Sequence, residues 1–175
     1  MSIGLTREQV LRFRALPQAE QARIIRGMSD GQLLAMDAAF ELWANEGQLP
    51  PQSEGWRTWL MMAGRGFGKT RAGAEWILAL GQQRPVRIAL VAASLDEARS
   101  VLVEGASGLL TLSRKRGLKL AFEPSKRQIV WPNGSIATLY SGESPELLRG
   151  PEHHFAWCDE LAKWARAEEC WANLE

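Results

Sequence analysis

The first part of the chain carries apolar residues at helical spacing. Between residues 6 and 46 they recur every three or four positions, the period of an amphipathic helix. One such stripe consists of Leu33, Met36, Phe40 and Trp43. The next segment, 45–55 (NEGQLPPQSEG), is rich in proline, glycine and polar residues, as loops are. We therefore expect an N-terminal helical segment over residues 1–47 and a separate domain over residues 48–175.

Two motifs predict where helices of this segment begin. In a capping box, a side chain at the helix start accepts a hydrogen bond from a backbone N–H that has no partner inside the helix. Thr6 with Gln9 has this spacing, and so does Ser29 with Gln32. The chain should therefore enter helices just after Thr6 and just after Ser29.

Beyond the linker, short apolar runs predict buried strands. The runs are Trp59–Ala63, residues 86–94 (VRIALVAAS) and Phe155–Cys158. Each is mostly or wholly apolar, as expected for a strand that is covered on both faces of a parallel sheet. Residues 127–140 (RQIVWPNGSIATLY) form two strand-like runs around an Asn-Gly pair, which is the strongest short signal for a β-hairpin.

Helical patterns lie between these strands. One helix should run from Lys69 to about Leu80. Another should begin at a capping box of Ser94 and Glu97 and continue through Leu112, because its leucines fall on roughly one face. Strands that alternate with helices predict an α/β fold with a largely parallel sheet.

Composition and charge narrow the class of protein. The chain has 175 residues, of which 46% are hydrophobic and 23% charged, and its formal net charge is +1. These values are typical of a globular domain and argue against a protein that coats nucleic acid. Two cysteines are too few for a disulfide framework, and no apolar run has the length of a signal-peptide core or a membrane span. The sequence therefore predicts a cytosolic protein.

A glycine-rich loop follows the first predicted strand of this domain and precedes its first helix. Residues 63–70 (AGRGFGKT) match the phosphate-loop pattern G-x-x-x-x-G-K-[ST] except at Ala63, which stands in place of glycine. The loop's glycines let backbone N–H groups turn inward around an anion, and the helix that begins near Lys69 adds its positive dipole end. The predicted nucleotide-binding residues are Ala63, Gly64, Arg65, Gly66, Phe67, Gly68, Lys69 and Thr70.

Three side chains of this loop have predicted roles in phosphate chemistry. Lys69 would reach the β- and γ-phosphate oxygens, and the hydroxyl of Thr70 would ligate magnesium. Arg65 would contact the γ-phosphate and stabilise the charge that develops there; its alternative is a plain surface charge. For the whole motif, the alternative is a flexible glycine turn with an incidental Gly-Lys-Thr.

An acidic pair follows the last predicted strand. Asp159 and Glu160 come directly after Phe155–Cys158, so both carboxylates should emerge at the carboxyl edge of the sheet, where open α/β sheets bind ligands. Asp159 would hold magnesium, partly through water, and Glu160 would be the catalytic base that polarises the attacking water. The alternative is that both acids cap the following helix, since carboxylates favour helix starts.

Together these segments resemble a known family. The loop GRGFGKTRAGAEW, the strand ALVAAS, the hairpin WPNGSIATLYSG, the segment PELLRG and the closing CDE are similar to those of the large terminase subunit of tailed bacteriophages and gene transfer agents. The resemblance covers roughly Trp56 to Trp164. It implies a P-loop NTPase fold of the additional-strand, RecA-like class with a mostly parallel sheet, incomplete at the C-terminus and preceded by the helical segment.

The resemblance also implies an activity and its partners. Large terminases are the ATPase motors that package DNA into preformed capsids, so the expected cofactors are ATP and Mg²⁺. The expected partners are double-stranded DNA, the portal protein and the small terminase subunit. The large subunits are expected to form a homo-oligomeric ring, without a membrane, in the cytoplasm of the bacterial host.

Further site residues follow from the resemblance. Arg65 is expected to sense or act on the γ-phosphate, and Arg149 of the LRG segment to reach the nucleotide of a neighbouring subunit as a catalytic arginine finger. Arg149 could instead stabilise a turn through bonds to nearby carbonyls. Gln52, Trp56 and Trp59 lie where similar motors contact the adenine base, and Gln52 is assigned to the nucleotide site.

Two other functions fit part of this pattern. A helicase-like DNA translocase has the same phosphate loop and acidic pair, although the hairpin and the LRG segment favour the terminase. A truncated prophage product would fold partially and catalyse nothing. Similar terminases carry a further strand and a nuclease after the acidic pair, whereas these residues stop at Glu175. We therefore expect the front part of a longer protein, with weak nucleotide binding and poor hydrolysis.

Overall fold

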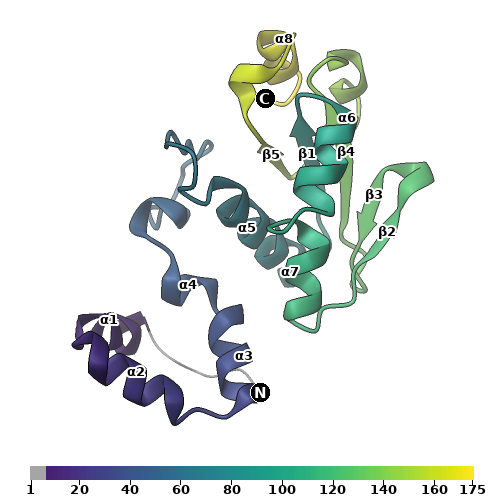
Figure 1. Ribbon diagram of the computed structural model, residues 1–175. Coiled ribbons are helices and arrows are strands. Elements are labelled where there is room, and N and C mark those ends of the chain that lie inside the picture. Colours follow the sequence, from purple (N-terminus) through teal and green to yellow (C-terminus); the bar gives the residue numbers. More distant parts are fainter. Residues whose placement is uncertain (1–6) are drawn as a thin grey trace. The chain divides into compact units, whose positions relative to one another are not determined.

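The computed structural model describes residues 7–175, and the capping box predicted at Thr6 lies outside them. Contacts divide the chain into two compact units, Met1–Met62 and Ala63–Glu175 (Figure 1). The first unit is helical, and the second contains a sheet with helices packed against it. The functional division between residues 1–47 and 48–175 stays a prediction.

The first unit consists of short helices. They are α1 Arg7–Ala15, α2 Gln18–Arg26, α3 Asp30–Ala38 and α4 Phe40–Trp43, followed by the 3-10 turn Glu46–Gln48. The capping box predicted at α3 is confirmed. The N–H of Gln32 donates to Ser29 Oγ at 3.4 Å, and the N–H of Ser29 donates to Gln32 Oε1 at 2.9 Å.

The apolar stripe of this unit is only partly buried. Met36 and Phe40 are buried, whereas Trp43 is 41% exposed. The chain leaves helical geometry at Ala39, where φ is −84° and ψ is 79°, so the stripe does not continue along one straight helix. Trp43 is held locally instead, because its indole Nε1 donates to the carbonyl of Met36 at 2.8 Å and its ring lies edge-on against Phe13.

The second unit is built on a five-stranded sheet with the order β2-β3-β4-β1-β5. Its strands are β1 Arg87–Ala92, β2 Ala121–Glu123, β3 Gln128–Val130, β4 Ile136–Ser141 and β5 Phe155–Cys158. β1 lies parallel to β4 and β5, while β2 pairs antiparallel with β3, and β3 with β4. The α/β class is confirmed, and the sheet is mixed, so the expectation of a mostly parallel sheet holds only for the strands around β1.

The hairpin accounts for this difference. The turn around Asn133-Gly134 joins β3 to β4 as predicted, with the N–H of Trp131 donating to the carbonyl of Ser135 at 2.9 Å. A hairpin connection makes its two strands antiparallel. Since β2 then adds to the outer edge of β3, one side of the sheet is antiparallel and the other, around β1, is parallel.

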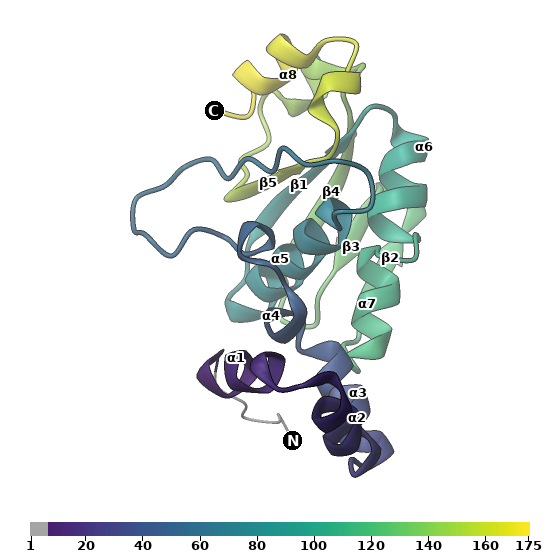
Figure 2. The ribbon, with the colours of Figure 1, turned by 60° about the vertical axis from the view of Figure 1, so that its left-hand side comes forward.

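The strand predicted at Trp59–Ala63 is absent. These residues have irregular structure, and the side chains of Leu60 and Met62 are 71% and 85% exposed. An apolar run becomes a strand only where a neighbouring strand satisfies its backbone groups. None of the strand pairings among the described residues includes this run. Figure 2 shows the long irregular segment through which the chain reaches α5.

Helices connect the strands of the second unit. They are α5 Lys69–Gln83, α6 Leu95–Glu97, the π-helix Ala98–Val103, α7 Leu109–Lys115 and α8 Ala167–Ala172, with 3-10 turns at Pro124–Lys126, Pro145–Leu148 and Leu161–Lys163. The helix predicted to begin at Lys69 is therefore confirmed as α5. In the described part of the chain, no helix is both long and apolar enough to cross a membrane.

The single helix predicted from Ser94 through Leu112 is broken into pieces. Ser94 does cap its start, since the N–H of Glu97 donates to Ser94 Oγ at 3.2 Å. The chain then continues as the π-helix and forms a turn between Gly105 and Gly108 before α7 begins. A Cβ at either glycine would lie 2.6 Å from a backbone carbonyl oxygen, so this tight turn requires glycine.

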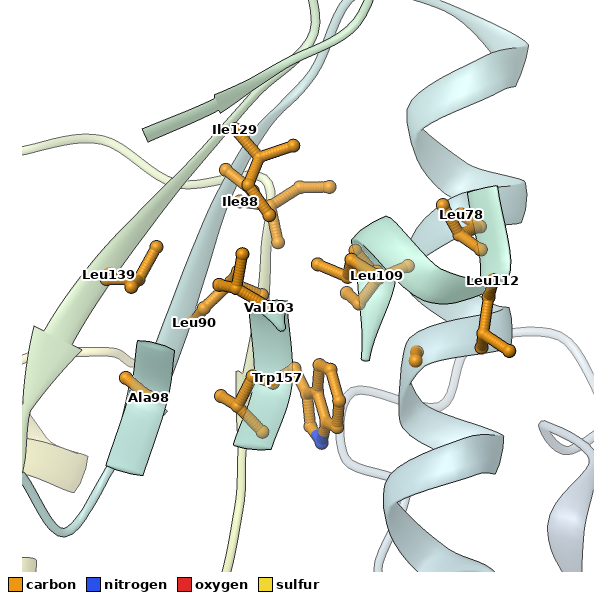
Figure 3. Close-up of a cluster of buried hydrophobic side chains, with 14 of the residues drawn as sticks. Leu78, Ile88, Leu90, Ala98, Val103, Leu109, Leu112, Ile129, Leu139 and Trp157 are labelled. Carbon is orange, nitrogen blue, oxygen red and sulfur yellow. The ribbon is translucent and has the colours of Figure 1, made fainter. Parts of the chain in front are cut away.

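The sheet is buried on both faces. On one face, α5, the π-helix and α7 contribute Leu78, Val103 and Leu109 to a cluster with Ile88 and Trp157 of the strands (Figure 3). The buried residues of the other cluster are Ala89, Val91, Tyr140, Leu148, Trp164 and Cys170. Burial on both faces explains why β1 reads as a continuous apolar run.

Helix α5 lies close to β5 at Gly73. A Cβ on Gly73 would lie 2.4 Å from the indole ring of Trp157, so a larger residue would have to displace β5 or the helix. This close packing helps to hold α5 in a fixed position on β5, the strand that ends at the predicted acidic pair.

Candidate functional site

The glycine loop, residues 63–68, leads directly into α5. Gly66 and Gly68 have φ angles of 84° and 89°, in the left-handed region that favours glycine. Gly68 is the N-cap of α5 and supplies no side-chain cap, and the first turn of the helix contains no acidic residue. A helix N-terminus of this kind attracts an anion through its dipole and through the N–H groups of its first turn.

Lys69 begins α5 and bends its side chain back over the loop. Its ammonium Nζ donates to the carbonyl of Ala63 at 2.7 Å and to that of Gly64 at 3.2 Å. These bonds close the loop on itself. The same charge also acts on the carboxylates of Asp159 and Glu160, so the loop and the acidic pair lie within electrostatic reach of each other.

Two glycines of the loop differ in whether their backbone conformation would accept a side chain, and this difference provides a test of the loop geometry. Gly64 does not have a positive φ, and a Cβ there would meet no atom within 4 Å. Gly66 also has open space, but its φ of 84° disfavours any side chain. Gly64→Ala should leave the free energy of unfolding within about 0.5 kcal/mol of the parent, whereas Gly66→Ala should lower it by about 1–2 kcal/mol. Urea unfolding measures both, and equal losses would contradict this loop geometry.

Asp159 follows β5 and is tied to the sheet by its backbone. Its N–H donates to a carbonyl of β1 at 2.9 Å, and its own carbonyl accepts from the indole Nε1 of Trp164 at 3.0 Å. Burial raises the pKa of Asp159, and the negative charge of Glu160 raises it further. Lys163 and Lys69 act on it in the opposite direction. Because a half-buried carboxylate beside a second one is stabilised by a cation, this position suits a metal ligand.

Glu160 comes next and is exposed. Its backbone has φ 47° and ψ 50°, a left-handed conformation that residues with a Cβ rarely adopt. Its carboxylate forms an ion pair with Lys163. The hydrogen bond from Lys163 lowers the pKa of Glu160, and the charges of Lys69 and Arg65 also lower it. Glu160 is therefore ionised at neutral pH, beside cations from two parts of the chain.

The fold thus gathers residues that are far apart in sequence. Arg65 and Lys69 of the loop come within electrostatic reach of Glu160, and Thr70 lies in the first turn of α5. The helix-capping alternative for the acids is not supported. They are followed by a 3-10 turn, Leu161–Lys163, and Glu160 makes no side-chain cap to it.

Arg149 follows the 3-10 turn Pro145–Leu148 and is exposed. With Glu146, Arg166 and Glu169 it lines a cavity of about 330 Å³. Arg166 pairs with both of these acids, at 3.4 Å and 2.5 Å. The guanidinium of Arg149 forms no hydrogen bond or ion pair with residues that the structure describes. The turn-stabilising bonds considered for it are therefore not found among them.

Gln52 belongs to the first unit. It is exposed and lies in irregular structure after Pro51. Trp56 and Trp59 of the same segment are half-buried. The contact of Gln52 with a nucleotide stays a prediction.

The donors at the site fit magnesium bound together with a nucleotide. Among residues 7–175, no cluster of three or more His, Cys, Asp or Glu side chains is suited to hold a metal ion. The available oxygens are those of the Asp159 carboxylate and the Thr70 hydroxyl, which are the hard ligands that Mg²⁺ prefers. Mg²⁺ usually binds through one or two such protein groups together with phosphate oxygens, so Asp159 and Thr70 are the candidate ligands.

Sequence patterns did not single out three residues beside the acids. Lys163 pairs with Glu160, Trp164 holds the carbonyl of Asp159, and the charge of Glu97 acts on both Asp159 and Lys163. The three-residue spacing between Glu160 and Lys163 was an available signal. No sequence signal connects Glu97 with the acids, because α6 reaches them only through the arrangement of the sheet.

The fold is similar to that of a solved viral protein. The structure is similar to that of the large terminase from a thermophilic bacteriophage, with a TM-score of 0.50 and 14% sequence identity. The similarity covers 62% of this chain and 28% of the bacteriophage protein, so the chain spans less than a third of that relative's length. At this identity the match concerns the fold alone.

The sequence itself identifies the family. The profile of the family described as terminase large subunit, T4likevirus-type, N-terminal, matches residues 60–174. The match includes the glycine loop, all five strands and the acidic pair, and the chain belongs to this family. The resemblance drawn from the loop, hairpin and acidic motifs is confirmed. No curated protein matches the sequence.

Proposed function

We propose that this chain is the ATPase part of a large terminase, in which ATP hydrolysis drives double-stranded DNA into a capsid. The observation that carries the proposal is the approach of the glycine loop to the acidic pair, in which the charges of Lys69 and Arg65 act on Glu160. A phosphate-loop ATPase needs this arrangement, because phosphate binding and water activation must reach the same triphosphate. Family membership favours the terminase over a helicase-like translocase.

The loop would bind the triphosphate. The proposed nucleotide-binding residues are Ala63, Gly64, Arg65, Gly66, Phe67, Gly68, Lys69 and Thr70. Gln52 is the proposed contact of the adenine base. Lys69 would exchange its bonds to the loop carbonyls for bonds to the β- and γ-phosphate oxygens. This exchange keeps the ammonium hydrogen-bonded in both states, which lowers the cost of binding.

The acidic pair would divide the remaining tasks. Asp159 and Thr70 would hold Mg²⁺, which neutralises phosphate charge when it is bound. Asp159 suits this task because its ionised form is disfavoured by burial and by Glu160 until a cation arrives. Glu160 would accept the proton of the attacking water, and its ionised state at neutral pH supports that role.

Two arginines would stabilise charge in the transition state. Arg65 would act from within the same loop. Arg149 would reach the nucleotide of a neighbouring subunit in a ring, and its exposed guanidinium, which has no partner among residues 7–175, supports this role. The partners of such an assembly are double-stranded DNA, the portal protein and the small terminase subunit, in the cytoplasm of a bacterial host.

Lys69→Ala tests the proposed nucleotide site. The substitution removes the charge that would bind the phosphates, so affinity for Mg²⁺ with a fluorescent ATP analogue should fall at least about tenfold, equivalent to about 1.4 kcal/mol. Lys119→Ala is the matched control, since Lys119 is an exposed lysine outside the loop, and it should leave affinity unchanged. Equal affinities for Lys69→Ala and the parent would reject the proposal. A parent chain without measurable affinity would favour a non-catalytic product.

A further inference from the structure

Lys163 is held beside the acidic pair by a rigid turn. Its N–H donates to the carbonyl of Glu160 at 2.8 Å, which closes the 3-10 turn Leu161–Lys163. The next residue, Trp164, is buried and donates its indole N–H to the carbonyl of Asp159 at 3.0 Å. The backbone on both sides of Lys163 is therefore fixed to the acids, and its ammonium reaches the carboxylate of Glu160.

Several negative charges surround this ammonium. The hydrogen bond to Glu160 raises the pKa of Lys163 most, and the charges of Glu160, Glu97 and Asp159 raise it further. These acids come from the end of β5 and from α6. Lys163 is therefore the cation paired with Glu160, and the charges of Glu97 and Asp159 also act on it.

The contact between Lys163 and Glu160 is suited to being broken. Their side chains are 57% and 45% exposed, and exposed ion pairs contribute little to stability. Glu160 also has the left-handed φ of 47°, a conformation whose cost neighbouring contacts must offset. The pair thus determines where the carboxylate lies without locking it in place.

We propose that Lys163 is a positioning residue that acts as an internal counter-ion. Its ammonium holds Glu160 and offsets the negative charge of the acidic pair, and its positive charge opposes the binding of a divalent cation at Asp159. The inference rests on the proposed function, because the cation is the one that would accompany the nucleotide. It goes beyond that function by assigning a role to a residue outside the loop and the acidic pair. Lys163 and the divalent cation therefore act on the same acidic pair, and the positive charge of each opposes the other.

Binding of Mn²⁺ alone, measured by electron paramagnetic resonance, tests this competition. Lys163→Met should bind Mn²⁺ about three- to tenfold more tightly than the parent chain, because a competing positive charge is gone. Lys163→Arg keeps the charge and should restore the parent affinity. Lys126→Met is the matched control, since Lys126 also pairs with a glutamate three residues away and is 65% exposed, and it should change nothing.

The outcomes separate this inference from the proposed function. Equal Mn²⁺ affinity in Lys163→Met and the parent, or no Mn²⁺ binding by either, overturns the role of Lys163. If Lys163→Met binds Mn²⁺ more tightly but Lys69→Ala keeps its nucleotide affinity, the counter-ion role stands and the proposed function fails. If Lys69→Ala loses nucleotide affinity but Lys163→Met binds Mn²⁺ with the same affinity as the parent, the proposed function stands and this inference fails.

Discussion

Glu160→Gln is expected to retain nucleotide affinity and to lose ATP hydrolysis by about 10²- to 10⁴-fold, the usual contribution of a general base. Glutamine keeps the shape of the side chain, and its amide oxygen can still accept a hydrogen bond from Lys163. It has no basic carboxylate, so it cannot take a proton from water. The loop that would bind the phosphates is unchanged, so affinity should stay within about twofold of the parent, or about 0.4 kcal/mol.

Single-turnover hydrolysis with the chain in excess over labelled ATP measures this effect even where steady-state turnover is slow. Glu123→Gln is the matched control, because Glu123 forms an ion pair with Lys126 at the same three-residue spacing, on β2. It should hydrolyse ATP like the parent. Hydrolysis by Glu160→Gln at the parent rate would remove Glu160 from the catalytic role.

Glu75→Gln is expected to destabilise the second unit by about 3 kcal/mol, the lower end of the range for breaking a buried ion pair from one side. Glu75 lies on α5 and is 5% exposed. Its carboxylate accepts from Arg71 Nε at 2.7 Å and pairs with Arg116 at the end of α7. The arginine side chains are themselves mostly shielded, at 25% and 18% exposure. The substitution would remove the counter-charge that these two shielded guanidinium groups share.

Urea unfolding, followed by tryptophan fluorescence, gives the free energy of unfolding for this comparison. Glu104→Gln is the matched control, since Glu104 pairs with Arg99 at 3.0 Å but both side chains are about half exposed. Its loss should be at most about 1 kcal/mol. Losses of similar size in the two variants would mean that the Glu75 cluster does not join α5 to α7. Because α5 also carries Lys69 and Thr70, Glu75→Gln should weaken nucleotide binding only to the extent that it increases the fraction of unfolded chain.

Local chemistry made part of this protein predictable from sequence. Gly66 and Gly68 require a left-handed backbone, and the lysine that follows them begins α5, so the loop could be assigned without coordinates. The Asn133-Gly134 pair identified the hairpin for the same reason. The acids of residues 159–160 were expected at the end of a buried strand, and β5 does end at Cys158.

Packing decided what the sequence pattern could not. An apolar run such as Trp59–Ala63 is compatible with a strand, but only a neighbouring strand can satisfy its backbone, and none of the described strands pairs with it. The apolar spacing after Ser94 did predict helical structure, but the tight turn at Gly105 and Gly108 divides it into separate helices. The contacted backbone atoms belong to residues 100–105, so this break is local, but the spacing of the apolar residues does not reveal it.

The sequence by itself determined the glycine loop, the acidic pair and their order along the chain, because each depends on backbone conformations and charges that a few adjacent residues set. Only the tertiary structure decided that the charges of Lys69 and Arg65 act on Glu160, and that the charge of Glu97 acts on Lys163. Electrostatic interaction falls off with distance in space rather than along the chain. The sheet, by placing β5 beside β1 and α5 against Trp157, determines those distances.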